Sequence, residues 1–362
     1  MACGPAACRP FAGASRAPLL AAWRRVYGEK EVREACGWDA AARDLPEDFV
    51  RGQLPFVQAA VTRAVADREG VLFLGACDLG TEAGKKDAAR IRSVACGPAS
   101  AWLDATPCTR QTQLSSSDYL HAARHRLGLH MPLMAAAPPC RCANASSARG
   151  DGAAPDHAQT CSATAGCRDL RHNIWVAAWR RVLQRAGCAS CREPRYREIA
   201  AAGRSATAGY RRGDILAIMP DGRLVALDGV VTHAWAPSNV DQACHINGHA
   251  AARKTNAKRA AFASLREGAG GYDFVPLAAE SGGRIDAEAL TFLKSLGDVA
   301  TLSNGRLSKS AFIRSALAEL SCALCRGNGR TYAASATRLL GHAGRDVSEG
   351  AVTASESEDD AG

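Results

Sequence analysis

The hydrophobic and polar positions from residue 169 onward predict a folded region that begins with an amphipathic helix. Between 169 and 186 the large apolar side chains recur at helical spacing, whereas the arginines lie largely on another face. Gly187 is expected to end this helix. Trp175 and Trp179 fall on its apolar side and are expected in the core, with stacking on nucleic-acid bases as the alternative.

Two strands, a helix, a strand and a further helix are predicted to follow. The apolar runs 215–219 and 224–227 flank a Pro-Asp-Gly sequence, which indicates a β-hairpin. Residues 250–265 have the pattern of a basic helix, 274–278 that of a buried strand, and 286–296 that of another helix. Because helices and strands interleave, the predicted fold class is α/β.

Composition divides the chain into five segments. The first is rich in Ala, Gly and Arg with short helical stretches, and it is expected to be a connector, partly helical or disordered. The second contains a helix and a cysteine–histidine cluster, the third is the α/β region, the fourth is helical, and the last is an acidic, disordered tail. Their ranges are 1–100, 101–168, 169–300, 301–345 and 346–362.

Charge favours a polyanionic partner. Lysine and arginine number 45 against 36 aspartates and glutamates, a formal net charge of +9. A basic surface of this kind is typical of nucleic-acid-binding proteins, although a merely basic domain is the alternative. The sequence contains no apolar run of the roughly 20 residues that cross a bilayer and no secretory signal, so we expect an intracellular protein without a membrane span.

Two aspartates bracket the predicted hairpin. Asp214 precedes its first strand and Asp228 follows its second, with 13 residues between them. A turn centred just after Asp221 would set Asp214 opposite Gly229, and Asp228 opposite Ile215. Opposed residues in a hairpin have Cβ atoms about 4.5–5.5 Å apart, so both carboxylates are expected to meet at the open end and share one cation.

Other charged side chains extend this candidate site. Lys254 and Lys258 are four residues apart on the predicted basic helix and therefore share a face. An ammonium group on that face would oppose the charge that develops on a phosphate oxygen. Glu193 supplies a third candidate carboxylate. Taken singly, each of these residues has an ordinary alternative as a solvated helix or strand-end residue.

Cysteines and a histidine form a candidate zinc site. Cys140-x-Cys142 and His157-x-x-x-Cys161 are two local ligand pairs that bracket a Gly- and Ala-rich loop, a spacing that suits tetrahedral Zn²⁺. Cys167 is the alternative ligand. Two further pairs lack a neighbouring His or Cys pair, so buried or incidental thiols are favoured over a second zinc site; they are Cys188–Cys191 and Cys322–Cys325.

The order of these motifs resembles one known family. In sequence they are Cys140-x-Cys142, His157-x-x-x-Cys161, Arg171-His172-Asn173, Glu193-Pro-Arg195, Gly213-Asp214, Asp228-Gly-Val-Val-Thr232, Lys258 and Phe274-Val-Pro276. Over roughly residues 100–300 the series resembles the zinc knuckle and restriction-like endonuclease in the C-terminal region of site-specific, LINE-type non-LTR retrotransposon reverse transcriptases. Each motif alone is weak, and their order carries the resemblance.

The resemblance implies a PD-(D/E)XK fold, a mixed sheet flanked by helices, for residues 169–300. It implies that Asp214 and Asp228 bind Mg²⁺ or Mn²⁺, that Glu193 is an auxiliary carboxylate, and that Lys258, or Lys254 in its place, assists phosphodiester hydrolysis. The family nicks chromosomal DNA to prime reverse transcription. DNA in the nucleus is therefore the expected partner, with the element's RNA as a second candidate.

Four residues of the first predicted helix are candidate nucleic-acid contacts. Arg171 and His172 stand near its expected start, where backbone N–H groups favour a DNA phosphate. Capping or packing at the helix end is the alternative for His172. Arg180 and Arg181 belong to the basic face of the same helix.

The sequence also departs from the family. Val230 occupies the position in which a strict D-x-K motif has its lysine, so the lysine would come from the helix, and Gly213 replaces the usual proline. No Tyr/Phe-x-Asp-Asp polymerase motif occurs, so we expect a fragment or domesticated remnant of the element rather than a complete reverse transcriptase. A non-catalytic, zinc-dependent nucleic-acid-binding remnant is the alternative function.

Overall fold

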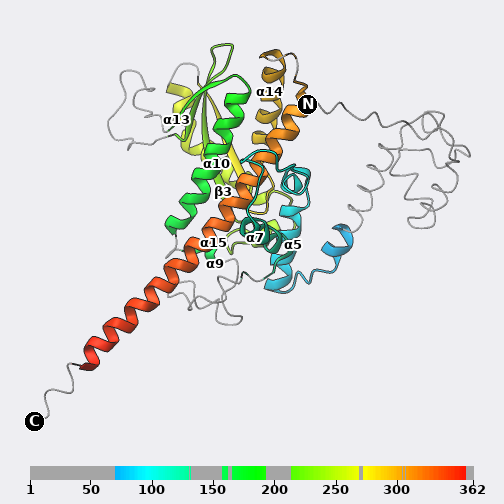
Figure 1. Cartoon of the computed structure of the whole chain (residues 1–362). Coiled ribbons are helices and arrows are strands. Elements are labelled where there is room, and N and C mark those ends of the chain that lie inside the picture. The colour runs from blue at the N-terminus through cyan, green and yellow to red at the C-terminus, as the bar shows by residue number, and fades with distance from the viewer. Residues whose placement is uncertain are drawn as a thin grey trace, which may run out of the picture. The chain divides into compact units, whose positions relative to one another are not determined.

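The computed structural model describes residues 70–129, 131, 157–161, 165–192, 213–268, 272–303, 305 and 307–355. The chain divides into two units, Met1–Ala76 and Cys77–Gly362, and the second contains the sheet and the helices that cover it (Figure 1). The short helical stretches predicted within residues 1–69 lie outside the described residues.

A four-stranded mixed sheet forms the centre of the second unit. Its strands are β1 (Ala189–Arg192), β2 (Ile215–Ile218), β3 (Leu224–Thr232) and β4 (Tyr272–Glu280), arranged in the order β1-β2-β3-β4. The first two pairings are antiparallel and the β3–β4 pairing is parallel. The α/β prediction is therefore confirmed, but β1 was missed, because four mostly exposed residues leave no apolar pattern.

The β2–β3 hairpin closes through a three-residue loop. Met219 donates its backbone N–H to the carbonyl of Arg223 at 2.8 Å, and Gly222 donates to the carbonyl of Met219 at 2.8 Å. Gly222 has a φ of 83°, in the left-handed region. This is the geometry of a tight turn followed by a bulge at a glycine, the usual form of three-residue hairpin loops.

The loop shifts the strand register by one residue from the predicted one. Ile215 lies opposite Leu227, not Asp228, so the predicted pairing is wrong. Asp214 directly precedes β2, and its side chain accepts the backbone N–H of Gly229, the residue that follows Asp228.

Helix α10 (Ala165–Arg185) packs on one face of the sheet together with α14 (Ala287–Ser303) and α15 (Lys309–Ser355). Trp175 and Trp179 are buried in this core, as predicted, and the Trp175 indole donates to the carbonyl of Leu277 at 2.8 Å. Figure 1 shows α10 and α15 side by side along the sheet. The three helices share one hydrophobic cluster with strands β2, β3 and β4.

Helix α13 (His249–Gly268) packs on the other face. Its Phe262 is buried against Ala226 of β3 and Phe274 of β4, which alternate with the residues that face α10. Glu280, at the end of β4, accepts hydrogen bonds from the first backbone N–H groups of the helix, those of Ala250 and Ala251, at 3.2 and 3.4 Å. A buried carboxylate therefore joins the end of the sheet to the beginning of α13.

The folded unit extends beyond the predicted domain limits on both sides. Helix α5 (Glu82–Val94), from the predicted connector, is joined to the α/β region by Arg92, whose guanidinium donates to the carbonyl of Cys244 at 2.9 Å. Helix α15, from the predicted separate C-terminal segment, supplies Phe312 and Leu320 to the main core. The remaining short elements are α6 (Gly97–Ser100), α7 (Ser116–Leu127), α9 (His157–Thr160) and α12 (Val240–Ala243).

Helix α15 is 47 residues long and ends at Ser355. It therefore continues past residue 346, where the acidic tail was predicted to begin. Throughout the described ranges, no helix combines the length and the apolar character needed to span a membrane.

The hairpin loop generates a stability prediction. Gly222→Ala should lower the free energy of unfolding by about 1–2 kcal/mol, because a Cβ is disfavoured at a left-handed φ. Gly305→Ala is the matched control, since its site has open space and an ordinary φ. Chemical denaturation of both variants measures the difference. Equal stabilities would contradict the assigned loop geometry.

Candidate active site

Two carboxylates meet at the open end of the hairpin. Asp214 directly precedes β2 and Asp228 lies within β3. The side chains lie within hydrogen-bonding reach of each other, and each changes the pKa of its partner. The hydrogen bond from the Gly229 backbone to Asp214 holds the Asp214 side chain beside β3, next to Asp228.

Asp214 is held by donors from two elements. Its Oδ2 accepts the backbone N–H of Gly229 at 2.7 Å, and its Oδ1 lies 3.1 Å from Nε2 of His172 on α10. Burial acts to raise the pKa of Asp214, but the hydrogen bonds with His172, Asp228 and Gly229 outweigh burial and hold the pKa below its ordinary value. Asp214 therefore loses its proton at a lower pH than Asp228 does.

Asp228 is the more buried carboxylate, with 4% of its surface exposed. Lys258 of α13 donates to both of its oxygens, at 2.9 Å to Oδ1 and 2.8 Å to Oδ2. Burial and the hydrogen bond with Asp214 nevertheless raise the pKa of Asp228 to about 6, against the opposing effect of Lys258. Ionisation of both carboxylates at once is therefore unfavourable. A cation bound between them would lower this energy.

The structure separates the two candidate lysines. Lys258 forms the ion pair with Asp228, and its side chain keeps 31% of its surface exposed. For Lys254, one helical turn earlier, the described residues contain no ion pair with either aspartate. The geometry therefore favours Lys258 as the lysine of the site.

His172 has a different environment from the predicted one. Helix α10 begins at Ala165, so His172 lies in its second turn or beyond, and the expected anion site at the helix start is wrong for this residue. Its ring instead contacts Asp214, and that hydrogen bond raises the pKa of His172 despite burial. The position of His172 was predicted wrongly because the apolar periodicity indicates which face of α10 is buried but not the residue at which the helix begins.

Arg171 is an interior residue. Its guanidinium donates to Gln159 of α9, to Asn328 of α15 at 3.1 Å and to the carbonyl of Val231 at 3.5 Å, and 3% of the residue is exposed. Burial lowers its pKa to about 10. The prediction that Arg171 contacts a DNA phosphate is therefore wrong, because a buried guanidinium cannot meet a phosphate backbone.

The other two predicted arginines lie further along α10. Arg181 forms an ion pair with Glu319, a buried residue of α15, and Arg185 contacts the same carboxylate at 3.1 Å. Arg180 is half-buried. Part of the basic face of α10 therefore serves the contact with α15, so a nucleic-acid contact by Arg181 would compete with an internal ion pair.

The predicted zinc knuckle is described only in part. His157 begins α9, and Cys161 is buried directly after it, with its backbone N–H donating to the carbonyl of His157 at 2.7 Å. Cys140 and Cys142 lie outside the described residues, as does Glu193 of the acidic site. Within the described ranges, no group of three or more His, Cys, Asp or Glu side chains is arranged to hold a metal ion.

The two extra cysteine pairs contain mostly buried thiols. Cys188, Cys322 and Cys325 are buried, whereas Cys191 is exposed on β1. Burial raises the pKa of Cys322 to about 11 and that of Cys325 further. A cysteine binds metal as a thiolate, and a raised pKa disfavours the thiolate. These environments therefore agree with the interpretation of Cys188, Cys322 and Cys325 as buried thiols.

The structural importance of Gly229 is not evident from the sequence pattern. A Cβ at this position would lie 3.0 Å from Cγ2 of Val176 and 3.3 Å from Cδ1 of Trp175, both on α10. The missing side chain therefore lets α10 approach β3 at the point where the Gly229 N–H binds Asp214. The available signal was the glycine that directly follows Asp228.

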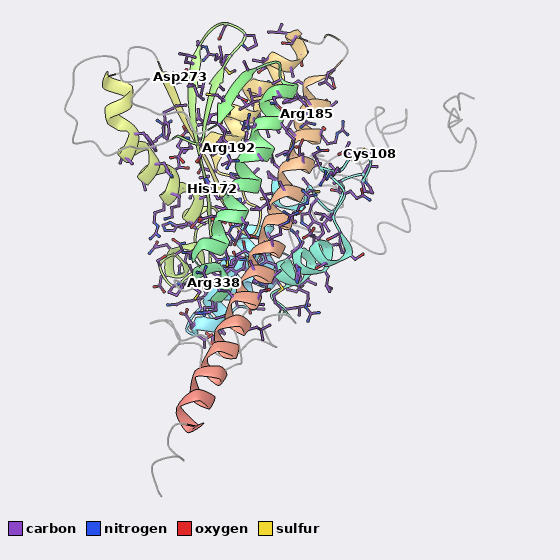
Figure 2. All side chains as sticks on the ribbon, turned by 60° about the vertical axis from the view of Figure 1, so that its left-hand side comes forward. Cys108, His172, Arg185, Arg192, Asp273 and Arg338 are labelled. Carbon is purple, nitrogen blue, oxygen red and sulfur yellow. The ribbon has the colours of Figure 1, made fainter. Side chains whose placement is uncertain are left out.

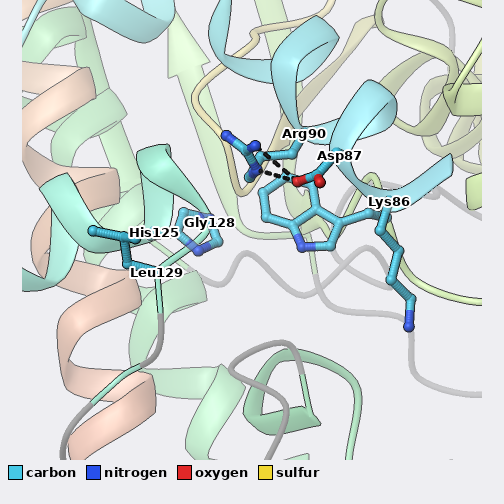
Figure 3. Close-up of a pocket in the computed structure, with 7 residues that line it drawn as sticks. Lys86, Asp87, Arg90, His125, Gly128 and Leu129 are labelled. Carbon is cyan, nitrogen blue, oxygen red and sulfur yellow. Dashed lines mark hydrogen bonds and ion pairs between the residues drawn. The ribbon is translucent and has the colours of Figure 1, made fainter. Parts of the chain in front are cut away.

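A small pocket lies elsewhere, between α5 and α7. Arg90 lines it and pairs with Asp87 at 2.8 Å (Figure 3). The Arg90 guanidinium also donates to the carbonyl of Arg126 at 2.8 Å. No residue of the acidic site lines this pocket, so we do not assign it to the same chemistry. Its lining residues are Lys86, Asp87, Arg90, His125, Gly128, Leu129 and Trp235.

The paired carboxylates predict a particular dependence of stability on pH. The raised pKa of Asp228 means that the folded state keeps a proton that the unfolded state loses between about pH 4 and 6, so stability must fall as pH rises through this window. His172 acts in the same direction at higher pH, because its pairing with Asp214 is lost as pH rises through its raised pKa.

Metal-free wild-type protein should therefore lose roughly 2 kcal/mol of unfolding free energy between about pH 4 and 7. Asp228→Asn should flatten this dependence, whereas Asp221→Asn, in the turn of the same hairpin, should retain it because the pKa of Asp221 is lowered and not raised. Denaturant titrations in a chelator give both curves. A flat wild-type curve would show that the pair does not share a proton.

The chain has no match among protein-family models, and no curated protein matches its sequence. The geometry of the acidic site and the order of the sequence motifs therefore carry the functional argument.

Proposed function

We propose that the chain is a divalent-metal-dependent DNA endonuclease of the restriction-like, PD-(D/E)XK type, derived from the C-terminal region of a non-LTR retrotransposon reverse transcriptase. The observation that carries the proposal is the convergence of Asp214, Asp228 and Lys258 at the end of one hairpin. A carboxylate pair with an adjacent lysine is the combination that metal-assisted phosphodiester hydrolysis requires.

The surrounding architecture supports this proposal. A mixed sheet with helices on both faces is the kind of scaffold that the resemblance implies. Asp228 lies within β3 and Asp214 directly precedes β2, whereas the lysine comes from α13, which Phe262 anchors on the sheet face opposite to α10. Groups held on such elements keep their relative positions when substrate binds.

The donor atoms fit a hard divalent cation. Asp214 and Asp228 present oxygen ligands, which Mg²⁺ and Mn²⁺ prefer, and burial together with the neighbouring Asp214 raises the pKa of Asp228 despite the contact with Lys258. When bound, the metal would polarise the scissile phosphate and lower the pKa of the attacking water. Glu193 remains a proposed auxiliary carboxylate.

Lys258 and His172 have distinct proposed roles. In the substrate complex Lys258 would turn its ammonium group from Asp228 toward a phosphate oxygen and stabilise the developing charge, a movement that its partly exposed side chain allows. His172 would hold Oδ1 of Asp214 and so orient that carboxylate. Chromosomal DNA in the nucleus is the proposed substrate, with the element's RNA as a second proposed partner.

A non-catalytic nucleic-acid-binding module is the second candidate function. One observation favours it. Lys258 contacts both oxygens of Asp228, and a purely structural ion pair would make the same two contacts as a catalytic lysine in the absence of substrate. The basic composition would persist in such a module after the loss of hydrolysis. Substitutions of Asp228 and Lys258 distinguish the endonuclease from the non-catalytic module.

Removal of a proposed metal ligand should abolish cutting but preserve binding. In the full-length chain, Asp228→Asn should reduce nicking of supercoiled plasmid in Mg²⁺ or Mn²⁺ by at least about 100-fold. DNA affinity should stay equal or rise slightly, because a negative charge is lost. Asp221→Asn is the matched control and should cut like wild type.

The lysine assignment has its own control on the same helix. The Lys258→Ala variant should lose nicking activity, whereas the Lys254→Ala variant should retain it. Of these two lysines, Lys258 is the one that contacts the acidic pair in the described structure. If Asp228→Asn cuts as fast as wild type, the activity belongs to another site. If wild type binds DNA but never cuts it, the non-catalytic function replaces the proposed one.

Zinc binding by the knuckle is a separate prediction. We expect one tightly bound Zn²⁺ per chain, lost in a Cys140→Ser, Cys161→Ser double variant because the site is a thiolate–imidazole set. A Cys108→Ser, Cys191→Ser variant is the control, since both of these cysteines are exposed. Elemental analysis of purified protein measures the metal. A folded but zinc-free wild type would exclude the knuckle.

A further inference from the structure

A corner of the fold next to the acidic site contains three arginines that have no carboxylate partner among the described residues. The corner is formed by α9, the first turns of α10 and the part of α15 that packs against both. Arg168 and Arg171 belong to α10, and Arg338 belongs to α15. The proposed mechanism uses none of the three.

The buried Arg171 gives this corner a positive charge from within. Its guanidinium donates to the side chains of Gln159 and Asn328 and to the carbonyl of Val231, all of which are neutral acceptors. Burial lowers its pKa to about 10, and the nearby charge of Arg168 acts in the same direction. Arg171 therefore remains charged at neutral pH. A charge in the interior is screened less than one in water, so its field extends to the adjacent surface.

The other two arginines bring positive charge to that surface. Arg168 is half-buried and donates to the backbone carbonyl of Gln159 at 3.5 Å, whereas Arg338 is exposed. A Cβ at Gly166 would lie 3.6 Å from Nη1 of Arg338, so this guanidinium lies beside the first turn of α10. In the part of the chain that the structure describes, Arg338 forms no hydrogen bond or ion pair. The exposed Asp169 of α10 pairs with neither arginine.

Helix α10 connects this corner to the acidic site. Arg168 and His172 are four residues apart, about 6 Å along the helix axis, and therefore share a face. His172 in turn contacts Asp214 at 3.1 Å. In Figure 2, Arg338 lies below His172, where α15 continues past the beginning of α10. DNA rises about 3.4 Å per nucleotide, so the corner lies within reach of phosphates a few nucleotides from the carboxylates.

The chemistry of the corner suits a backbone phosphate. A guanidinium presents planar, paired donors that match phosphate oxygens. Arg168 is held only by a long hydrogen bond to a neutral carbonyl, so its charge is not cancelled by that contact. Arg181 and Arg185, further along α10, differ because both contact the carboxylate of Glu319.

We propose that Arg168 and Arg338 bind backbone phosphates of the DNA strand beside the phosphate that is cut, within the positive field of Arg171. This inference rests on the proposed endonuclease function and identifies the surface that aligns the substrate strand with the acidic pair. The two arginines contribute to binding and alignment, while bond cleavage depends on the acidic pair and Lys258.

The test compares an Arg168→Ala, Arg338→Ala double variant with Arg314→Ala in the full-length chain. Arg314 is the matched control, because it is also exposed on α15 but precedes Arg338 by 24 residues, about 36 Å along the helix. Binding of a fluorescent DNA duplex is measured over a salt series without divalent metal. Nicking is measured with Mg²⁺ over a range of DNA concentrations.

Loss of two phosphate contacts should reduce the slope of log affinity against log salt by about 1.8, or about 0.9 for each contact. The KM for DNA should rise about tenfold with kcat within about twofold of wild type, the pattern of lost uniform binding. An Arg168→Lys, Arg338→Lys double variant should keep most of the slope, because both charges remain. Arg314→Ala should match wild type in both measurements.

The two measurements distinguish failure of this inference from failure of the proposed function. If wild type cuts and the double alanine variant behaves like Arg314→Ala, the phosphate-binding surface is overturned and the endonuclease stands. If no protein cuts but the double alanine variant alone loses salt slope, the surface stands and the catalytic function fails. If the slope falls for a single-stranded RNA but not for the DNA duplex, the surface binds RNA and the DNA assignment is overturned.

Denaturant titration of the same variants separates binding from folding. Arg168 contacts Gln159, so a loss of stability in the double alanine variant without a change in slope would show a structural role and overturn the inference. If the double variant does not fold, Arg338→Ala decides alone, because Arg338 forms no hydrogen bond or ion pair within the described ranges. A slope lowered by about 0.9 in this variant supports the proposal, and an unchanged slope overturns it.

Discussion

The close approach of α10 to strand β3 is the contact on which the core and the acidic site both depend. Gly229 permits it, because any Cβ at that position would crowd Val176 and Trp175. On the apolar side, the approach seats Trp175 and Trp179 against the sheet. On the polar side, the same approach lets His172 reach Asp214, so packing and electrostatics share one geometric constraint.

The acidic pair is an unfavourable arrangement that the fold maintains through its other contacts. Two largely buried carboxylates repel each other, and the raised pKa of Asp228 expresses that repulsion together with its desolvation. Lys258 from one helix and His172 from another offset part of this energy. A site that is incompletely balanced in the protein alone is suited to a cation or to a transition state that brings compensating charge.

The distribution of positive charge shows why composition is a poor guide to a binding surface. The chain has 45 lysines and arginines, yet several that seemed suited to DNA serve the interior or an interface between helices. Arg171 joins α9, α10 and α15 within the core, and Arg181 joins α10 to α15.

Local patterns in the sequence by themselves determined the elements of the α/β class, the burial of Trp175 and Trp179, the hairpin and the identities of its two flanking aspartates. These features follow from periodicity and turn chemistry over a few residues. Tertiary structure alone decided the strand register, the pairing of Lys258 and not Lys254 with Asp228, and the burial of Arg171. The physical reason is that each of these outcomes depends on distances between segments remote in sequence, which local spacing does not contain.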